Sequence, residues 1–294
     1  YSSAHELPKL REYPNFSDLS GFLVGDIARD GRAWRVEGQD AHGARQSISA
    51  KILVLAAGTL ATTRLVLRAL RYDQAVPLLS SPTAAFVLWL PGCLATPRVP
   101  GFGLGQLSFV LGLTTVTAFG STFATTGLLV SEFVRKLRWR RRYGIDLLGA
   151  LLGSCLVGNL FLPGTLTSGE AKLQDDGGLI VSGVYRDAVL PLMKEAERKL
   201  RRSFQSLGAL LLPGSFTIGL PGGDVHYAGT LPMRERPRIG ESSWTGEVVG
   251  LDGVYVVDGA CLPILPEKPH TLTLMANADR IGRNIADQQL RGAC

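Results

Sequence analysis

The sequence has little charge and few residues arranged to bind metals or form disulfides. Charged residues make up 19% of its 294 residues, below the ~25% of an average globular chain, whereas hydrophobic residues make up 46%. A chain of this composition can bury a core, which excludes an intrinsically disordered protein. The four cysteines show no CxxC spacing, which disfavours a zinc ribbon and a disulfide scaffold. The sequence therefore predicts a folded protein without a metal site.

Charge is also missing from two long stretches in the middle of the chain. Residues 99–131 and 147–169 carry no charged side chain, and a basic stretch lies between them, formed by Arg135, Lys136, Arg138, Arg140, Arg141 and Arg142. One interpretation is a membrane- or lipid-associated region with a basic loop. The other is a buried domain core beside an exposed basic helix face, which the Gly, Thr and Ser content of the first run favours. Nucleic-acid binding is a weaker interpretation of the basic stretch, because Trp139 and Tyr143 are the only aromatic residues that accompany it, so no nucleic-acid partner is predicted.

Several secondary-structure elements are visible in the pattern of apolar and turn residues. Residues 22–39 predict a hairpin around a polar turn at 28–32, and a second turn follows at 40–43. Residues 51–56 predict a strand buried on both faces, which ends at Ala57 and Gly58 and leads into a helix. An apolar stripe from Val189 to Leu207 predicts a helix that Asp187 caps and that Gly208 follows. A short buried strand is predicted at 253–259.

The four histidines fall into two pairs. His5 and His42 lie among polar residues and are assigned to the surface. His226 lies in a glycine-rich loop, and His270 comes just before a predicted helix N-terminus. A neutral imidazole is the usual proton acceptor near neutral pH, but a lone histidine in such a loop is more often a hydrogen-bonded structural residue. Both interpretations stay open for each residue.

Asp258, at the end of the 253–259 strand, also has two interpretations. It can cap the next element as a turn residue. Alternatively, it can accept hydrogen bonds from a ligand hydroxyl at the carboxyl end of a sheet, where ligands of α/β folds bind. The residue type alone does not separate them.

Two blocks of sequence, taken in order, resemble a known family. The first is Val54-Leu55-Ala56-Ala57-Gly58-Thr59-Leu60-Ala61-Thr62-Thr63-Arg64. The second contains the pattern His226-x-x-Gly-Thr-x-x-Met, then Val257-Asp258-Gly259-Ala260, then Pro266, His270, Thr273, Met275, Ala278 and Arg280. These blocks resemble the glucose–methanol–choline (GMC) flavin oxidoreductases over residues 50–70 and 222–286.

The resemblance implies an α/β fold with an α+β substrate domain. A partial FAD-binding, Rossmann-like domain (residues 1–75) would be interrupted by a sheet-plus-helix substrate domain (76–235), and the chain would return to the FAD-binding domain over 236–294. That family begins with a strand, a GxGxxG turn and a helix. Here the one similar cluster, residues 101–105, has a different spacing and follows a proline. We therefore expect a preceding segment, or another chain, and weak activity of residues 1–294 alone.

The resemblance also implies residue roles. His226 would accept the hydroxyl proton of an alcohol, and His270 would hold the same oxygen. Ala57, Gly58, Asp258, Gly259 and Thr271 would contact FAD. The implied activity is an FAD-dependent alcohol oxidase or dehydrogenase that moves hydride from the carbinol carbon to the flavin N5. The substrate would be a small alcohol, and the apolar middle suggests a lipophilic one. A cytoplasmic or peripheral membrane location is favoured. A non-catalytic membrane- or lipid-associated protein that uses residues 99–169 is the alternative.

Overall fold

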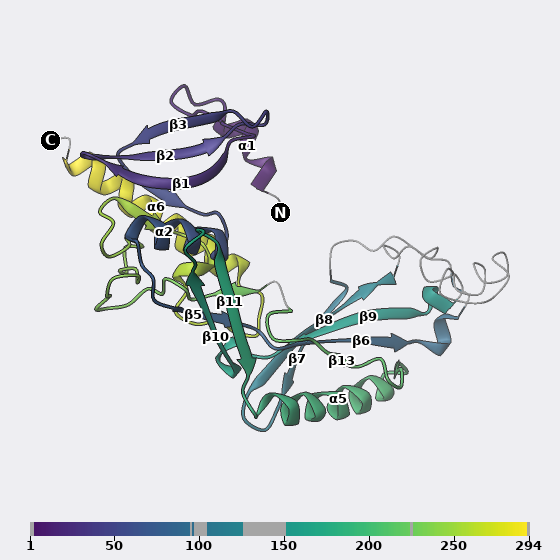
Figure 1. Cartoon of the computed structure of the whole chain (residues 1–294). Coiled ribbons are helices and arrows are strands. Elements are labelled where there is room, and N and C mark those ends of the chain that lie inside the picture. Colours follow the sequence, from purple (N-terminus) through teal and green to yellow (C-terminus); the bar gives the residue numbers. More distant parts are fainter. Residues whose placement is uncertain (1–2, 95, 97–104, 126–150, 224–225, 293–294) are drawn as a thin grey trace.

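The structure, a computed structural model, describes residues 3–94, 96, 105–125, 151–223 and 226–292. Figure 1 shows an elongated molecule with a broad antiparallel sheet and one long helix at one end, and a small antiparallel sheet beside a second long helix at the other. A short parallel pair of strands and a four-stranded sheet lie between these ends. The short helices whose full bounds fall among the described residues are η1 (Ser3–His5), α1 (Leu7–Leu10), η2 (Pro91–Cys93), η4 (Gly164–Leu166) and η5 (Gly259–Cys261).

The small sheet is a three-stranded antiparallel meander. Its strands are β1 (Leu23–Asp30), β2 (Ala33–Gln39) and β3 (Arg45–Ala50). The β1–β2 turn includes Gly31 at φ 58°, a conformation that suits glycine. The predicted hairpin is therefore confirmed, although β1 continues through residues that were predicted to be a turn. The third strand was not predicted.

The parallel pair consists of β4 (Leu53–Leu55) and β15 (Val254–Val256). Helix α2 (Thr59–Leu70) follows β4 and packs through Leu65 and Val66 against the apolar residues of both strands. Helix α6 (Thr271–Gly292) packs through Ile281 against Tyr255 and Val257. The predicted strand–glycine–helix unit is confirmed. The expectation that β4 is buried on both faces is wrong for Val54, which is 50% exposed because α6 covers β15 but does not cover that side chain.

A four-stranded sheet connects this centre to the broad sheet. Its order is β11–β10–β5–β14, and all three pairings are antiparallel. The strands are β5 (Val76–Ser80), β10 (Thr167–Leu173), β11 (Leu179–Tyr185) and β14 (Tyr227–Ala228). Because β14 directly follows His226, this sheet carries one of the candidate histidines.

The broad sheet has the order β12–β6–β9–β8–β7, with β13 also paired to β6. Its strands are β6 (Thr83–Trp89), β7 (Leu107–Gly112), β8 (Thr117–Ala124), β9 (Cys155–Phe161), β12 (Leu210–Leu211) and β13 (Thr217–Ile218). Helix α5 (Val189–Ser206) packs on one face (Figure 1) and buries Leu192, Met193 and Leu200. A Cβ atom on Gly158 would lie 2.2 Å from the Phe86 ring, so a glycine is needed for that ring to lie against the strand.

Helix α5 confirms the predicted helix but corrects its ends. The helix begins at Val189 with Ala188 as its N-cap, so Asp187 lies one residue too early to cap it. Leu207, expected in the buried stripe, is 75% exposed because it is the C-cap residue and the chain turns away at Gly208, φ 79°. Pro191 lies in the first turn, where its missing N–H costs no helical hydrogen bond.

The two uncharged stretches of sequence fall largely into the broad sheet where the structure describes them. Strands β7, β8 and β9 account for residues 107–112, 117–124 and 155–161, so their apolar character comes from sheet packing. Among the helices in the described ranges, none combines the length and apolar content that crossing a bilayer requires. The basic stretch from Arg135 to Arg142 lies outside the described residues. The membrane- or lipid-associated alternative therefore gains no support.

Candidate active site

The carboxyl ends of β4 and β15 form the first part of the candidate site. Because the two strands are parallel, both end at the same edge of the sheet, where ligands of α/β folds bind. There, the Gly58 N–H donates to Oδ2 of Asp258 at 2.9 Å, and the Thr62 hydroxyl donates to the same oxygen. Oδ1 of Asp258 accepts from the Ala260 N–H at 2.9 Å, which caps η5. Asp258 thus joins two turns that lie far apart in the sequence.

Helix α2 presents its N-terminus at this corner. Its N-cap is Gly58, at φ 88°, and no side chain caps the helix. Ala57 and Gly58 are exposed, and a Cβ atom built on Gly58 would have no neighbour within 4 Å. A helix N-terminus offers free N–H groups and a partial positive charge to an anion. The corner therefore suits the polar, anionic part of a dinucleotide such as FAD.

The loop that carries His226 is attached to the same corner. The Thr59 hydroxyl donates to the carbonyl of Tyr227, the residue after His226, at 2.7 Å. The Gly229 N–H donates to the Gly259 carbonyl at 3.0 Å. A Cβ atom on Gly259 would lie 2.4 Å from the Thr59 hydroxyl oxygen and 2.8 Å from the Tyr227 carbonyl oxygen. Gly259 therefore allows the His226 loop and α2 to approach each other this closely.

A buried hydroxyl pair extends this attachment. Thr63 in α2 and Thr230 in the His226 loop are both fully buried, and their hydroxyl oxygens lie 2.6 Å apart. The Leu231 N–H also donates to the Ala260 carbonyl at 2.9 Å. Each of these bonds connects the loop to the corner that Asp258 holds. The position of His226 therefore depends on the same elements that suit a dinucleotide.

The structure brings His226 and His270 together. Their ring centroids lie 5.2 Å apart at an interplanar angle of 81°, so one imidazole meets the other edge-on. Phe161, at the end of β9, meets His226 in the same manner at 4.9 Å and 67°. Three segments that are distant in the sequence thus meet at one point. His5 and His42 are exposed, as predicted.

His270 lies at the N-terminal end of α6. Its carbonyl accepts the N–H of Leu274 at 2.9 Å, which is the first helical bond described there, and Thr271 is the first residue of the helix. Thr271 is exposed, whereas His270 is half-buried. The start of α6 therefore places a second free helix N-terminus next to the paired histidines.

Burial favours the neutral form of both imidazoles. It lowers the pKa of His226 below the ordinary histidine value, because a charged ring would lose hydration there. It lowers the pKa of His270 for the same reason, and charge on His226 lowers it further. A neutral imidazole can accept a proton, so this pair can act in general base catalysis at neutral pH.

The loop before His270 is also joined to the broad sheet. The hydroxyl of Thr117, in β8, donates to the Glu267 carboxylate at 2.6 Å. Thr117 begins β8 and Phe161 ends β9. Together with the contact between Phe161 and His226, this bond therefore places one end of these two strands beside the histidine pair. Neither Phe161 nor Thr117 was predicted from the sequence, because each lies in a segment with only the features of a sheet strand.

The predicted site residues thus form two adjoining groups. One contains Ala57, Gly58, Asp258 and Gly259, and the other contains His226, His270 and Thr271. The structure shows that the Asp258 side chain caps η5. Gly259 is buried, and its Cα side faces the Thr59 hydroxyl. Direct contact of either residue with a cofactor stays a prediction. Within the described ranges, no group of three His, Cys, Asp or Glu residues is arranged to hold a metal ion.

A hollow on the surface lies away from these residues. It has a volume of about 780 Å³ and is lined by one end of the β1–β3 meander and by Arg64 and Arg68 of α2. Arg68 pairs with Asp26 at 2.7 Å, and Arg64 donates to the Gly25 carbonyl at 3.2 Å. These contacts attach the irregular part of β1 to α2, so both arginines have structural partners. The hollow contains none of the predicted site residues.

Comparison with known proteins supports the fold. No family model and no curated protein matches the chain. Among solved structures, pyridoxine 4-oxidase from Mesorbium loti matches with a TM-score of 0.60 and 16% identity, over 90% of this chain and 57% of that one. An FAD-dependent oxidoreductase from Chaetomium thermophilum, solved with a bound fragment, matches with a TM-score of 0.60 and 14% identity, over 98% of this chain and 64% of that one. The chain thus spans about three fifths of the length of these structures, and it shares the fold of that part of FAD-dependent oxidoreductases.

Proposed function

We propose that this chain is part of an FAD-dependent oxidoreductase that oxidises an alcohol to a carbonyl compound. The observation that carries the proposal is the pairing of His226 with His270, 5.2 Å apart, beside a corner suited to a dinucleotide. The fold shared with two solved oxidoreductases supports it, as does the similarity of both motif blocks to the GMC flavin oxidoreductases.

The residues fit FAD in their chemistry. Ala57, Gly58 and the N-terminus of α2 would hold its phosphate region, with Asp258 and Gly259 fixing that corner. Thr271 and the N-terminus of α6 would face the edge of the flavin ring that gains negative charge on reduction. When bound, FAD supplies the acceptor for the hydride of the carbinol carbon.

His226 would accept the proton of the substrate hydroxyl, and His270 would hold the same oxygen through a hydrogen bond. The alcohol would lose its hydroxyl proton to an imidazole nitrogen, and bound FAD would supply the acceptor for its hydride, so that a carbonyl compound would remain. Burial keeps both imidazoles neutral and ready for this role. The attachment of the His226 loop to Thr59 and Gly259 fixes the direction from which the base approaches.

We also propose that a further polypeptide element completes the FAD site. β4 pairs with β15 along one edge, and its residue Val54 is 50% exposed, which is unusual in a parallel sheet. A strand–GxGxxG–helix element that adds to the other edge of β4 would cover Val54 and supply the remaining phosphate contacts. The supporting observation is the exposed side of β4.

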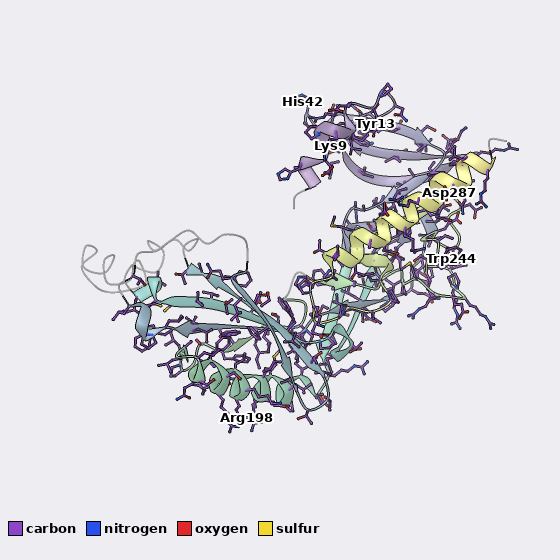
Figure 2. All side chains as sticks on the ribbon, turned by 180° about the vertical axis from the view of Figure 1, so that it is seen from behind. Lys9, Tyr13, His42, Arg198, Trp244 and Asp287 are labelled. Atoms are coloured by element: carbon purple, nitrogen blue, oxygen red, sulfur yellow. The ribbon has the colours of Figure 1, made fainter. Side chains whose placement is uncertain are left out.

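The proposal is tested by replacing His226 with alanine in the whole protein loaded with FAD. Loss of the base is expected to slow flavin reduction by an alcohol by about 10²- to 10⁴-fold, the usual contribution of general base catalysis. The measurement is anaerobic stopped-flow absorbance of the flavin. His42→Ala is the matched control, since His42 lies in the exposed β2–β3 turn, at the end of the molecule away from α5 (Figure 2).

Two results would contradict this proposal. Unchanged flavin reduction in His226→Ala would remove the base assignment. A wild-type protein that binds FAD stoichiometrically, but whose flavin no alcohol reduces, would remove the reaction itself.

A further inference from the structure

Strand β11 is an edge strand of the four-stranded sheet, in which β10 is its neighbour. At one end of this pair, the Gln174 N–H donates to the Gly178 carbonyl at 2.9 Å. At the other end, the Arg186 N–H donates to the Leu166 carbonyl at 3.0 Å. Bonded and non-bonded pairs alternate in an antiparallel ladder, so the even-numbered residues of β11 are the ones that bond to β10. The N–H and carbonyl groups of its odd-numbered residues therefore point outward.

The outward backbone groups of Val181 and Gly183 are free of protein partners within the part of the chain that the structure describes. Figure 1 shows β11 beside β10 at the side of this sheet. A row of free N–H and carbonyl groups along an edge is a template for a further strand. The backbone of β11 can therefore accept another extended segment without breaking any bond within the sheet.

The sequence of β11 does not protect this edge. Edge strands commonly carry charges, prolines or irregular pairing that keep other strands away. Strand β1 has such features, because its pairing shifts between Val24 and Asp26 and because Arg29 and Asp30 follow. The edge strand β3 begins with Arg45. In contrast, β11 reads Leu-Ile-Val-Ser-Gly-Val-Tyr and contains neither a charge nor a proline.

Two apolar side chains stand beside the free edge. Ile180 is 51% exposed and Val184 is 63% exposed, and both lie on the same face of β11 because side chains alternate along a strand. The residues of β10 on that face are polar, namely Ser168, Glu170 and Lys172. These neighbours give the two apolar side chains nothing to pack against, which indicates that a partner covers them.

We propose that β11 pairs antiparallel with β11 of a second copy of this chain, about a two-fold axis at Ser182. The two four-stranded sheets would then form one continuous sheet. In this register, Ile180 lies opposite the partner's Val184, and the symmetry repeats the contact on the other side of the axis. Val181 lies opposite the partner's Gly183, and the free backbone groups of both residues become bonded. This inference is independent of the proposed function.

The charges at the ends of β11 favour a second copy as the occupant. The same register places the exposed Arg186 beside the partner's Gly178. Asp176 is also exposed, and its Oδ1 accepts the Gly178 N–H at 2.7 Å, which holds the carboxylate at this turn. Arg186 of each copy would thus come next to the partner's Asp176, so opposite charges meet at both ends of the paired strands.

The first test is sedimentation velocity of the whole protein loaded with FAD, which is expected to be a dimer at micromolar concentration. Val181→Pro removes an outward N–H and places a ring on the edge, but it removes no bond to β10. It is expected to raise the dissociation constant of the dimer by about tenfold or more. Val181→Thr is the matched control, because it keeps the N–H and a β-branched side chain, and it should remain a dimer.

A charge exchange tests the register. Ile180→Glu and Val184→Lys should each weaken the dimer by about tenfold or more, because each places a charge against an apolar side chain of the partner. In the double variant, the new carboxylate of one copy faces the new ammonium group of the other, and association should be restored. Within one chain the new charges lie opposite Lys172 and Ser168, so neither meets a like charge there. Leu207→Glu is the control, because Leu207 is 75% exposed at the end of α5.

A cross-link tests the position of the axis. Residue 182 is the one position of β11 that would lie opposite itself, so Ser182→Cys is expected to form a disulfide between copies under a mild oxidant, seen on a non-reducing gel. Val184→Cys is the matched control and should not form one. Circular dichroism and FAD content establish that each variant is folded. Flavin reduction should be unchanged, since β14, which follows His226, is at the opposite end of the strand order.

The outcomes either support or overturn the inference. Dimer loss in Val181→Pro, recovery in the double variant and the Ser182→Cys cross-link would support it. A whole protein that stays monomeric at all concentrations would mean that β11 is free or covered by another segment, and the inference is overturned. A dimer that Val181→Pro leaves intact, or equal cross-linking of both cysteine variants, would place the contact elsewhere and overturn it as well. An intact dimer whose flavin no alcohol reduces would contradict the proposed function and leave this inference standing.

Discussion

The two parts of the candidate site are held in different ways. At the corner between β4 and β15, the carboxylate of Asp258 accepts hydrogen bonds from the Gly58 N–H, the Ala260 N–H and the Thr62 hydroxyl. At the histidine pair, the two imidazoles meet each other edge-on, Phe161 meets His226 in the same way, and burial is the main cause of the lowered pKa of both histidines. One part is fixed by directional bonds to a charge, whereas burial next to other rings sets the pKa of the other part.

This difference fits the work that each part would do. A corner that positions a helix N-terminus and a loop benefits from charge-assisted hydrogen bonds, since they define both distance and direction. A base that accepts a proton must remain neutral beforehand, and apolar burial achieves that. The hydrogen bonds at the corner therefore fix the positions of the α2 N-terminus and the His226 loop, and burial at the histidine pair keeps the imidazoles neutral. Replacements in the corner should mainly change stability, whereas replacements in the pair should mainly change proton affinity.

The largest effect on stability is expected for Asp258→Ala. It leaves the N–H groups of Gly58 and Ala260 without their acceptor, and it should lower the free energy of unfolding by about 3 kcal/mol. Asp258→Asn keeps one acceptor oxygen and should lose about half as much. Chemical denaturation with urea measures both values.

The exposed Asp252 provides the matched control for this experiment. It lies just before β15, at the opposite end of the strand, so Asp252→Ala changes the same charge without affecting the corner. If Asp258→Ala and Asp252→Ala cost the same free energy, the corner is not held by its hydrogen bonds, and the contrast between the two parts of the site disappears.

A smaller loss is expected for Gly259→Ala. The new Cβ atom would lie 2.4 Å from the Thr59 hydroxyl oxygen and 2.8 Å from the Tyr227 carbonyl oxygen. Overpacking of this kind costs about 1–3 kcal/mol, and here it would also push the His226 loop away from α2. We expect a lower free energy of unfolding and slower flavin reduction in the same variant.

Gly282→Ala is the control, because a Cβ atom at Gly282 in α6 has no neighbour within 4 Å. Alanine replaces glycine inside a helix there and should stabilise the protein by up to about 1 kcal/mol. If both alanine variants stabilise the protein, the close approach of Thr59 to Tyr227 is not needed, and Gly259 has another role.

Local patterns in the sequence predicted part of this fold, namely the β1–β2 hairpin, the unit from β4 to α2, helix α5 and strand β15. The α5 stripe repeats at helical spacing, so Leu192, Met193 and Leu200 could be assigned to a core before any partner was known. The strand–glycine–helix unit at residues 53–70 was visible because its apolar run ends at a glycine. These features depend on residues that are close in the sequence, which is why they could be predicted from it.

Contacts between segments that are distant in the sequence could not be predicted in this way. Nothing in the β9 sequence shows that Phe161 meets His226, because that contact depends on how the broad sheet is placed against β14. The strand β3 is mostly polar and lacks the apolar signal of a buried strand. The bonds from Asp258 to Gly58 and Thr62 depend on the parallel pairing of β4 with β15, which brings together residues about 200 positions apart.

The smallest effect is expected from the pH dependence of the histidine pair. Burial lowers the pKa of His226 and His270 in the folded protein below the value of about 6.5 of an unfolded histidine. Above that unfolded value both states are neutral, and the stability contribution of the neutral rings is fully present. As the pH falls below it, the unfolded chain binds more protons than the folded one, so the free energy of unfolding decreases until the folded rings also become protonated.

His226→Gln should therefore flatten the dependence of unfolding free energy on pH between about 7 and 5, by at most about 1.4 kcal/mol per pH unit, the limit for one proton. Urea unfolding at a series of pH values measures this slope, and His42→Gln, in the exposed turn, should leave it unchanged. Because charge on His226 also lowers the pKa of His270, the variant should raise the pKa of His270, which NMR titration of its ring protons reports. An unshifted His270 would mean that the two imidazoles titrate independently, and the pair would then be two separate histidines that share an apolar site.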